Sequence, residues 1–419
     1  MYTMKFFGFM KIVTLSVIIS LVFASCGFNP QSSSATSTIA PPIAETSTSI
    51  SQSLIPQNTE TPRIENTPTN IVANAIPLSP INTENIQQIQ PLFTHQVSWD
   101  AISYWLVAMS PNSKWVALAA KYSSQLYLLP LTWNTNNSIV PTIDVASSRV
   151  YKLRTESIAF SPDSAYLAVA GNDNSVAVLD LENPDKIETF DIGNWTSAVS
   201  FVGDSKTLAI GTMRGYEGSL RIIDLETGTT KYEISKNLPS GGICNVTVSP
   251  DEKVLAIGYC TNVFDISTWD IDKNYEYIAR LTGIDEVNTT CPHFCTDNRN
   301  IIAFNPVTGD IASGTNYGRI PLQDIHSGKL RTIISTVVRD GDTAYDASPI
   351  NALAFTPDGE LLVIGTTPEI QIRSVIDSKL LWSHNEAPRY IAGMAMSADA
   401  RLIISVNSDG EVKFWGVSK

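Results

Sequence analysis

Short apolar runs recur along the chain from residue 86 onward, and polar turn residues separate them. Clear examples stand at 167–171, 208–211, 255–258 and 362–365, where Leu, Ile or Val are mixed with Ala and Gly. Runs this short are typical of strands, since buried helices need longer ones. Because these runs are apolar at every position, we expect neighbouring sheets to cover both faces of each strand. The small residues would let those sheets approach closely.

A turn segment of the Ser-Pro-Asp type precedes each apolar run. Proline fixes φ at the first corner of a tight turn, and Asp or Asn tolerates the position that follows. Seven versions occur, at 108–112, 159–163, 200–204, 247–251, 303–307, 354–358 and 395–399, spaced 41 to 56 residues apart. A four-stranded propeller blade takes about 40–50 residues. The repeats therefore predict an all-β fold, a seven-bladed β-propeller of four-stranded antiparallel blades over residues 86–419.

Alternating runs follow the apolar ones and supply a third strand to each repeat. One such run ends in the pair Trp269-Asp270, and others end in Leu179-Asp180, Ile223-Asp224 and Gln323-Asp324. The pattern resembles WD-repeat proteins over about four-fifths of the chain. This resemblance implies a rigid scaffold that binds protein or peptide partners through its loops and performs no catalysis.

The seventh repeat ends at Lys419 just after its third strand, which leaves that blade with an open edge. A ring removes such an edge by borrowing a strand from the other end of the chain. Residues 86–93 alternate between apolar and polar side chains. We predict that they form the outer strand of the last blade, where Pro91 is tolerated because an outermost strand has a free side.

The amino terminus has the features of a secretory signal over residues 1–25. Lys5 and Lys11 precede or flank an apolar run at 12–23, and small residues follow it up to Cys26. The segment 22–26 resembles the lipobox of bacterial lipoproteins, which implies that Cys26 carries a diacylglycerol and anchors the chain outside the bacterial cell membrane. Two or three acyl chains suffice for stable anchoring. The alternative is an ordinary signal peptide with a cysteine beside its cleavage site.

Residues 26–85 are rich in Ser, Thr and Pro and poor in aromatic and charged residues. Such a segment cannot bury enough apolar surface to offset its ordering entropy. We expect a disordered linker that separates the anchor from the propeller.

Four further cysteines, Cys244, Cys260, Cys291 and Cys295, are candidates for disulfides in an exported protein, and four cysteines allow three pairings. Cys244 and Cys260 lie eight residues on either side of Glu252, around one Ser-Pro-Asp turn. That spacing places them opposite each other on adjacent antiparallel strands, which leaves Cys291 and Cys295 to pair locally. The alternative, a zinc site, needs two such pairs at ligand spacing.

Charge and motifs restrict the function further. The net charge is -13, with 28 Lys and Arg against 41 Asp and Glu, which argues against nucleic-acid binding and against adsorption to anionic lipids. No nucleophile, zinc-protease or phosphate-loop motif occurs. We therefore expect a monomeric binding module with an unidentified protein or peptide partner, no catalytic or metal-binding residues and no cofactor.

Two other functions stay open. One is an extracellular propeller enzyme of the glycosidase, lyase or quinone-dependent dehydrogenase type, and the other is a subunit for envelope assembly. Carboxylates or histidines converging at one mouth of the channel would favour catalysis. A lining of mixed polar and apolar residues would favour binding.

Overall fold

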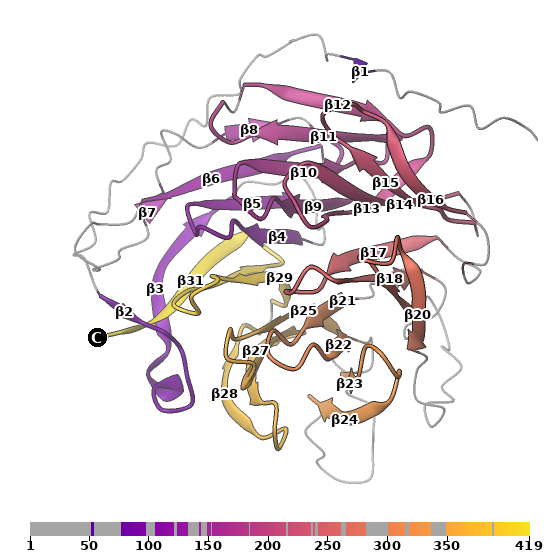
Figure 1. The fold of residues 1–419 in the computed structure, drawn as a ribbon. Helices are drawn as coiled ribbons and strands as arrows, with labels where there is room; N and C mark the ends of the chain where they lie inside the picture. The colour runs from indigo at the N-terminus through magenta and orange to yellow at the C-terminus, as the bar shows by residue number, and fades with distance from the viewer. Residues whose placement is uncertain are drawn as a thin grey trace, which may run out of the picture. The chain divides into compact units, whose positions relative to one another are not determined.

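The computed structural model describes residues 52–53, 77–97, 105–120, 124–132, 142–143, 149–151, 153–183, 185–214, 217–235, 238, 242–260, 265–281, 301–314, 318–336, 349–387 and 389–419. The chain divides into two units, Met1–Thr46 and Ser47–Lys419, and every described residue belongs to the second. Its strands form seven antiparallel sheets, which are the blades of a β-propeller (Figure 1). The predicted fold class is confirmed.

The strands of blades 2 to 4 follow one another in sequence order from the centre of the ring outward. Blade 2 has β9 (Ser157–Phe160), β10 (Tyr166–Ala170), β11 (Ser175–Asp180) and β12 (Ile187–Asp191). Blade 3 has β13 (Trp195–Phe201), β14 (Thr207–Met213), β15 (Leu220–Asp224) and β16 (Thr230–Ile234). Blade 4 has β17 (Ile243–Val248), β18 (Val254–Tyr259), β19 (Ile266–Asp270) and β20 (Glu276–Leu281).

Blades 5 and 6 repeat this plan, and blades 1 and 7 vary it. Blade 5 has β21 (Ile301–Phe304), β22 (Ile311–Gly314), β23 (Arg319–Gln323) and β24 (Leu330–Ser335), and blade 6 has β25 (Ile350–Phe355), β26 (Leu361–Thr366), β27 (Glu369–Ser374) and β28 (Leu380–Asn385). Blade 1 has β4 (Trp105–Met109), β5 (Trp115–Ala120), β6 (Leu126–Thr132) and β8 (Arg149–Tyr151), with β7 (Thr142–Ile143) on the end of β6. Blade 7 has β29 (Ile391–Met396), β30 (Ile403–Asn407), β31 (Glu411–Ser418) and β3 (Gln90–Gln96).

The turn between the first and second strands explains the Ser-Pro-Asp repeat. In blade 2, Ser161 Oγ donates to Asp163 Oδ1 at 2.6 Å and accepts from the backbone N–H of Tyr166 at 2.9 Å. The same two bonds recur at Ser110, Ser249, Thr356 and Ser397. A hydroxyl and a carboxylate or amide two residues later therefore close each of these turns.

An aspartate at the last residue of the third strand, or directly after it, caps the next turn. An Oδ1 atom accepts the backbone N–H three residues later in four blades, at Asp180, Asp224, Asp270 and Asp324. An Asp side chain in this role replaces a backbone turn bond. The aspartate of the repeat is thus a turn residue in each of these blades.

The core lies between blades. The second strands are buried on both faces, as the apolar runs predicted, and β18 and β26 are buried at every residue. A Cβ atom on Gly314 would stand 2.7 Å from Ile350 Cγ2, and one on Gly365 would stand 3.0 Å from Ile391 Cγ2. Glycine is therefore needed where the second strand of one blade meets the first strand of the next.

The ring closes through the amino-terminal strand. The first strands contact each other in order around the ring, and β29 of blade 7 contacts β4 of blade 1. Strand β3 pairs with β31 from Gln90 opposite Gly416 to Gln96 opposite Glu411, and Figure 1 shows the indigo strand beside the yellow one. A strand from the start of the domain thus completes the last blade, as the edge argument predicted.

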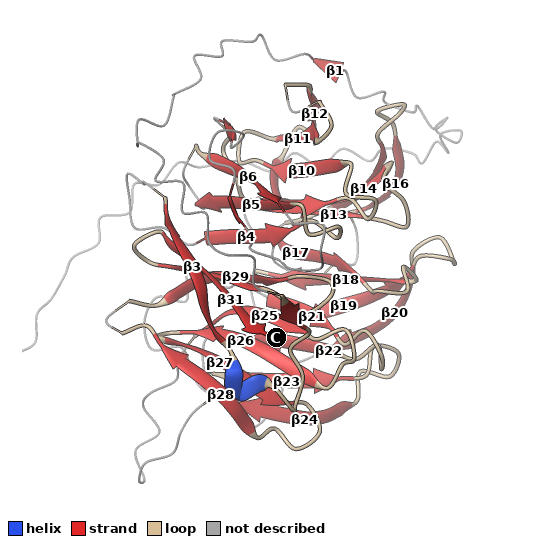
Figure 2. Cartoon of the chain, turned by 90° about the vertical axis from the view of Figure 1, so that its left-hand side faces the viewer, coloured by secondary structure: helices blue, strands red, loops and turns tan. Residues whose placement is uncertain are grey.

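The predicted bounds of that strand were wrong at its start. Residues 86–88 form a 3₁₀ turn, η1 (Ile86–Gln88), the one helix among the described residues, drawn in blue in Figure 2. Ile86 and Ile89 are buried against Trp415 and Trp382, and apolar residues three apart suit a 3₁₀ turn. The strand begins after this turn and extends to Gln96, with a bulge between Pro91 and Phe93.

The folded domain also begins earlier than residue 86. Strand β2 (Leu78–Ser79) pairs with the end of β31, and Leu78 and Ile81 are buried in the core. Farther upstream, β1 (Gln52–Ser53) pairs with β12. The expected linker at 26–85 therefore contains segments that join the propeller, because their backbone groups extend open sheet edges.

Candidate functional site

A pocket of about 730 Å³ lies between blades 3 and 4. Its blade 3 side comes from the outer strand β16 and the residues after it: Tyr232, Glu233, Ile234, Ser235 and Leu238. Residues alternate across a strand, so Tyr232 and Ile234 share one face of β16. Both belong to the apolar cluster that contains Trp269 of blade 4. We call this pocket the 3/4 groove.

Blade 4 supplies the other side of the 3/4 groove with Tyr259, Ser267, Trp269, Tyr277 and Arg280. Ser267 and Trp269 lie two residues apart on β19, on the same face of that strand. Strand β20 places Tyr277 opposite Trp269 and Arg280 opposite Ser267. The sheet register therefore gathers two aromatic rings and a guanidinium on one surface.

Ser267 organises the floor of the groove. Its Oγ accepts the indole N–H of Trp269 at 2.7 Å and lies 2.7 Å from the hydroxyl of Tyr259. Tyr259 is fully buried, and this burial raises its pKa, so its phenol stays protonated. Tyr277, by contrast, is 51% exposed and meets Trp269 edge to face with ring centroids 5.4 Å apart. The floor is fixed by hydrogen bonds, and the rim is open.

One ion pair lies at the groove, and a second lies on the other face of its blade 3 side. Arg280 donates to both carboxylate oxygens of Asp265, at 2.7 and 2.5 Å, and this contact raises the pKa of Arg280. Asp265 is buried, while the Arg280 side chain is 47% exposed. On the opposite face of β16 from Tyr232 and Ile234, Arg221 donates to Glu233 Oε1 at 3.2 Å and to the Ile192 carbonyl of blade 2 at 2.6 Å. The guanidinium of Arg280, which lines the groove, is thus matched by the Asp265 carboxylate.

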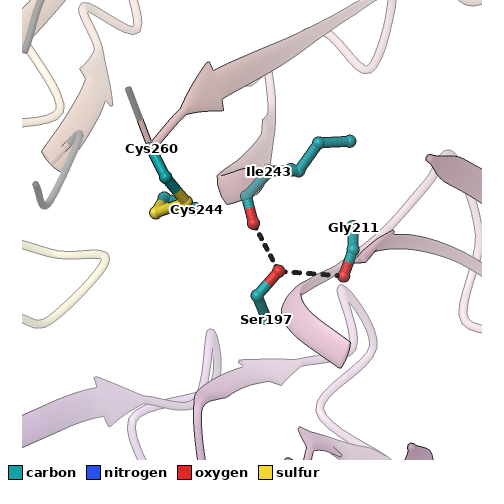
Figure 3. The surroundings of a disulfide bond; sticks show 5 residues. All are labelled: Ser197, Gly211, Ile243, Cys244 and Cys260. Atoms are coloured by element: carbon teal, nitrogen blue, oxygen red, sulfur yellow. Dashed lines mark hydrogen bonds between the residues drawn. A yellow bond between two sulfur atoms is a disulfide. The ribbon is translucent and has the colours of Figure 1, made fainter. Parts of the chain in front are cut away.

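A disulfide joins Cys244 to Cys260 beside the groove, with Cα atoms 5.2 Å apart. Cys260 directly follows Tyr259, and Cys244 occupies the bulge of β17 between Ile243 and Asn245. Figure 3 shows Ser197 of blade 3 reaching this bulge, where its Oγ donates to the Ile243 carbonyl and lies 3.3 Å from the Gly211 carbonyl. The disulfide ties the first two strands of blade 4 together, and the hydrogen bond of Ser197 to Ile243 joins this part of blade 4 to blade 3.

The pairing of Cys244 with Cys260 is the one that the spacing around Glu252 predicted. Cys26, Cys291 and Cys295 lie outside the described residues, as does His293 between the last two. Of the groove residues, sequence reasoning singled out only Trp269, as part of the Trp-Asp pair. Tyr232, Tyr277 and Arg280 were missed. They come from two different blades, so no short sequence motif contains them.

Metal and membrane features are limited in the part of the chain that the structure describes. No three His, Cys, Asp or Glu side chains within it gather closely enough to hold a metal ion. Within these residues, no helix has both the length and the apolar character needed to cross a membrane.

The comparisons with known proteins agree with the fold. Residues 147–180 match the family model described as WD domain, G-beta repeat. The match begins near β8 of blade 1 and covers the first three strands of blade 2, so this repeat is offset from the blade by one strand. The same offset leaves blade 7 to be completed by β3.

Two curated relatives are similar to part of the chain. The WD repeat-containing protein SL1-17 of Schistosoma mansoni is 31% identical over 103 residues, which are 24% of this chain and 32% of that protein. The WD repeat and SOCS box-containing protein 1 of Takifugu rubripes is 28% identical over 115 residues, 26% of this chain and 24% of that protein. The matched region thus spans a third or less of each relative. Together with the seven sheets, these matches support a WD-repeat β-propeller.

Proposed function

We propose that the protein is a binding module that holds a protein or peptide partner in the 3/4 groove. The observation that carries this proposal is the open rim of the groove, where Tyr277 is 51% exposed beside Trp269 and Arg280. Tyr, Trp and Arg are the residues that most often dominate the energy of protein interfaces. Propellers of the WD-repeat type present such surfaces on a rigid ring.

The chemistry of the groove favours binding over catalysis. The hydroxyl of Ser267 is bonded to Trp269 and Tyr259, and no described histidine or carboxylate is hydrogen-bonded to it as a base would be. The carboxylate of Asp265 is held by Arg280. This mixed polar and apolar lining suits recognition of a partner.

We further propose that the module is displayed outside a bacterial cell membrane on a lipid anchor. The support is the signal-like segment 1–25, the small residues before Cys26 and the Ser/Thr/Pro-rich stretch that follows. A cysteine carrying two or three acyl chains is held stably on a bilayer, and a long spacer gives the propeller reach.

The test is to express the tagged full-length chain in a bacterial host, cross-link living cells and identify what co-purifies. A Cys26→Ser variant runs in parallel, with Ser34→Ala in the spacer as a matched control. We expect one specific partner with wild type and control, and loss of both the partner and membrane attachment with Cys26→Ser. Absence of a partner for the wild type would overturn the binding module, and a membrane-bound Cys26→Ser variant would overturn the anchor.

A further inference from the structure

Apolar side chains form both walls of the 3/4 groove. Blade 3 contributes Tyr232 and Ile234, which share one face of β16, and Leu238, which follows that strand. Blade 4 contributes Trp269 of β19 and Tyr277 of β20, which lie opposite each other in the sheet. A ligand that places an apolar group between these walls removes apolar surface from water on both sides, which favours binding.

The two rings on the blade 4 wall are a feature of that blade. Trp269 lies opposite Tyr277, and at the same register of blade 6 Arg373 lies opposite Leu380. Tyr277 is 51% exposed, so its ring is available to a ligand. Blade 4 therefore presents an open aromatic surface at a position where blade 6 carries a buried guanidinium and an aliphatic side chain.

The polar atoms on the floor of the groove are bonded to one another. Ser267 Oγ accepts the indole N–H of Trp269 and lies 2.7 Å from the hydroxyl of Tyr259. A polar or charged side chain that reached this floor would exchange its water for groups that are already bonded, which costs free energy. An apolar side chain gives up no hydrogen bond in the same place. The floor therefore favours an apolar side chain.

Arg280 offers a ligand one set of hydrogen-bond donors. Its Nε and Nη2 atoms donate to Asp265, whereas no hydrogen bond of Nη1 occurs among the described residues, and the Arg280 side chain is 47% exposed. Because Asp265 balances the charge, the N–H groups of Nη1 suit a neutral acceptor such as a backbone carbonyl. The net charge of -13 repels acidic segments at long range. Charge complementarity thus favours an uncharged ligand.

We infer that the 3/4 groove binds a leucine-sized apolar side chain from an uncharged segment of a partner protein. The side chain packs between Ile234 on one wall and Trp269 and Tyr277 on the other. A backbone carbonyl of the same segment accepts from Arg280 Nη1, three residues along β20 from Tyr277. This inference rests on the proposed function, since it names the chemistry of the partner that the groove holds.

The test is calorimetric titration of the full-length protein with the acetylated, amidated heptapeptide Gly-Ser-Ala-Leu-Ala-Ser-Gly. The comparison peptides carry alanine, aspartate or lysine in place of the leucine. We expect the leucine peptide to bind about tenfold more tightly than the alanine peptide, because only it buries a full aliphatic side chain. The aspartate and lysine peptides should bind no more tightly than the alanine peptide, because the floor leaves a charged group unpaired.

Two variants of the protein test the two contacts. Tyr277→Ala removes the exposed ring, and the affinity for the leucine peptide should fall about fivefold. Arg280→Lys keeps a cation beside Asp265 and removes the Nη1 donors, so the affinity should fall about threefold. The matched control is Leu380→Ala, which removes a 37% exposed side chain at the same register of blade 6 and should leave the affinity unchanged.

Absence of binding by the leucine peptide, or equal affinity for the leucine and alanine peptides, would overturn the inference. Equal losses with Tyr277→Ala and Leu380→Ala would do the same, and both of these side chains are exposed, so the variants should fold. The cellular cross-linking separates this failure from failure of the proposed function. If the wild type captures a partner and Tyr277→Ala captures it equally, the binding module stands and the apolar site falls.

Discussion

The interfaces between blades 3 and 4 and between blades 6 and 7 share their strand register, with Trp269 opposite Leu255 and Trp415 opposite Ile403, and they differ in the side chains around the indole. In one, a pocket of about 730 Å³ lies beside Trp269, which is 9% exposed, and Ser267 and Ile234 are among its lining residues. In the other, Lys413 and His384 occupy the equivalent positions and bury Trp415. The backbone of the repeat is therefore set by its turns. The two interfaces differ in the side chains that neighbouring blades contribute at these positions.

The inner ends of blades 4 and 7 differ as well. The bulged residue of the first strand is Cys244 in blade 4 and Ala392 in blade 7. Cys260 donates its N–H to Gly242 at 2.8 Å, and the equivalent Ser408 donates to Tyr390 at 3.0 Å. The backbone bond is thus conserved between the two blades, and a covalent link is added only beside the open groove. We interpret the disulfide as compensation for the contacts that an unfilled interface lacks.

The largest effect is expected from emptying the filled interface with Lys413→Ala. The Glu386 side chain is 3% exposed, so the variant leaves a buried carboxylate without its main cation. Removing one partner of a buried ion pair costs about 3–5 kcal/mol of the free energy of unfolding. Urea denaturation at pH 7 measures this loss.

The double variant Lys413→Ala, Glu386→Gln is the control, because it removes the charge as well as its partner. It should recover more than half of the lost stability. If Lys413→Ala alone is as stable as the wild type, the ion pair between Lys413 and Glu386 does not hold blades 6 and 7 together.

The second effect concerns the link beside the open groove. The cysteines are 16 residues apart in sequence, and closing a loop of this size stabilises the folded state by about 3 kcal/mol. We expect Cys244→Ser, Cys260→Ser to lose about 2–3 kcal/mol in urea denaturation under oxidising conditions. The cysteines outside the described residues are unchanged in this variant, so dithiothreitol added to it measures their separate contribution. No loss in the double serine variant would contradict the compensating role.

A third, smaller effect separates the two tryptophan sites. Ser267 bonds both Trp269 and Tyr259, whereas Ser405 of blade 7 accepts only the Trp415 indole N–H in the hydrogen bonds described, at 2.8 Å. A buried hydrogen bond contributes about 1 kcal/mol. Ser267→Ala should therefore cost about 2 kcal/mol and Ser405→Ala about 1 kcal/mol in the same denaturation measurement. Equal losses would show that the second bond to Tyr259 adds nothing.

The features that could be predicted from the sequence are those made within one repeat. The hydroxyl of Ser161 and the carboxylate of Asp163 close a turn within five residues, so their pattern is visible in a short window. The pairing of Cys244 with Cys260 followed from its symmetry about such a turn. Ring closure followed from an unpaired edge, although Ile86 and Ile89 fit a 3₁₀ turn as well as a strand.

The 3/4 groove could not be predicted in this way. Its residues come from the outer strand of one blade with the residues after it, and from three strands of the next blade. A sequence pattern gives the face of each residue on its strand, but it does not give the volume left between two blades. That volume is decided by packing across the interface.

The smallest effect is a pH dependence at the strand that closes the ring. His95 lies on β3 opposite Val412, and its burial lowers its pKa below the ordinary value of 6.5. As the pH falls below 6.5, His95 therefore binds a proton more readily in the unfolded chain than in the folded chain. This difference favours unfolding. Stability from His95 is fully present above pH 6.5 and is lost as the pH falls from there toward the lowered pKa. The melting temperature of the wild type should fall more between pH 7.5 and pH 5 than that of His95→Gln. Identical falls would mean that the protonation of His95 does not affect the stability of the strand that completes blade 7.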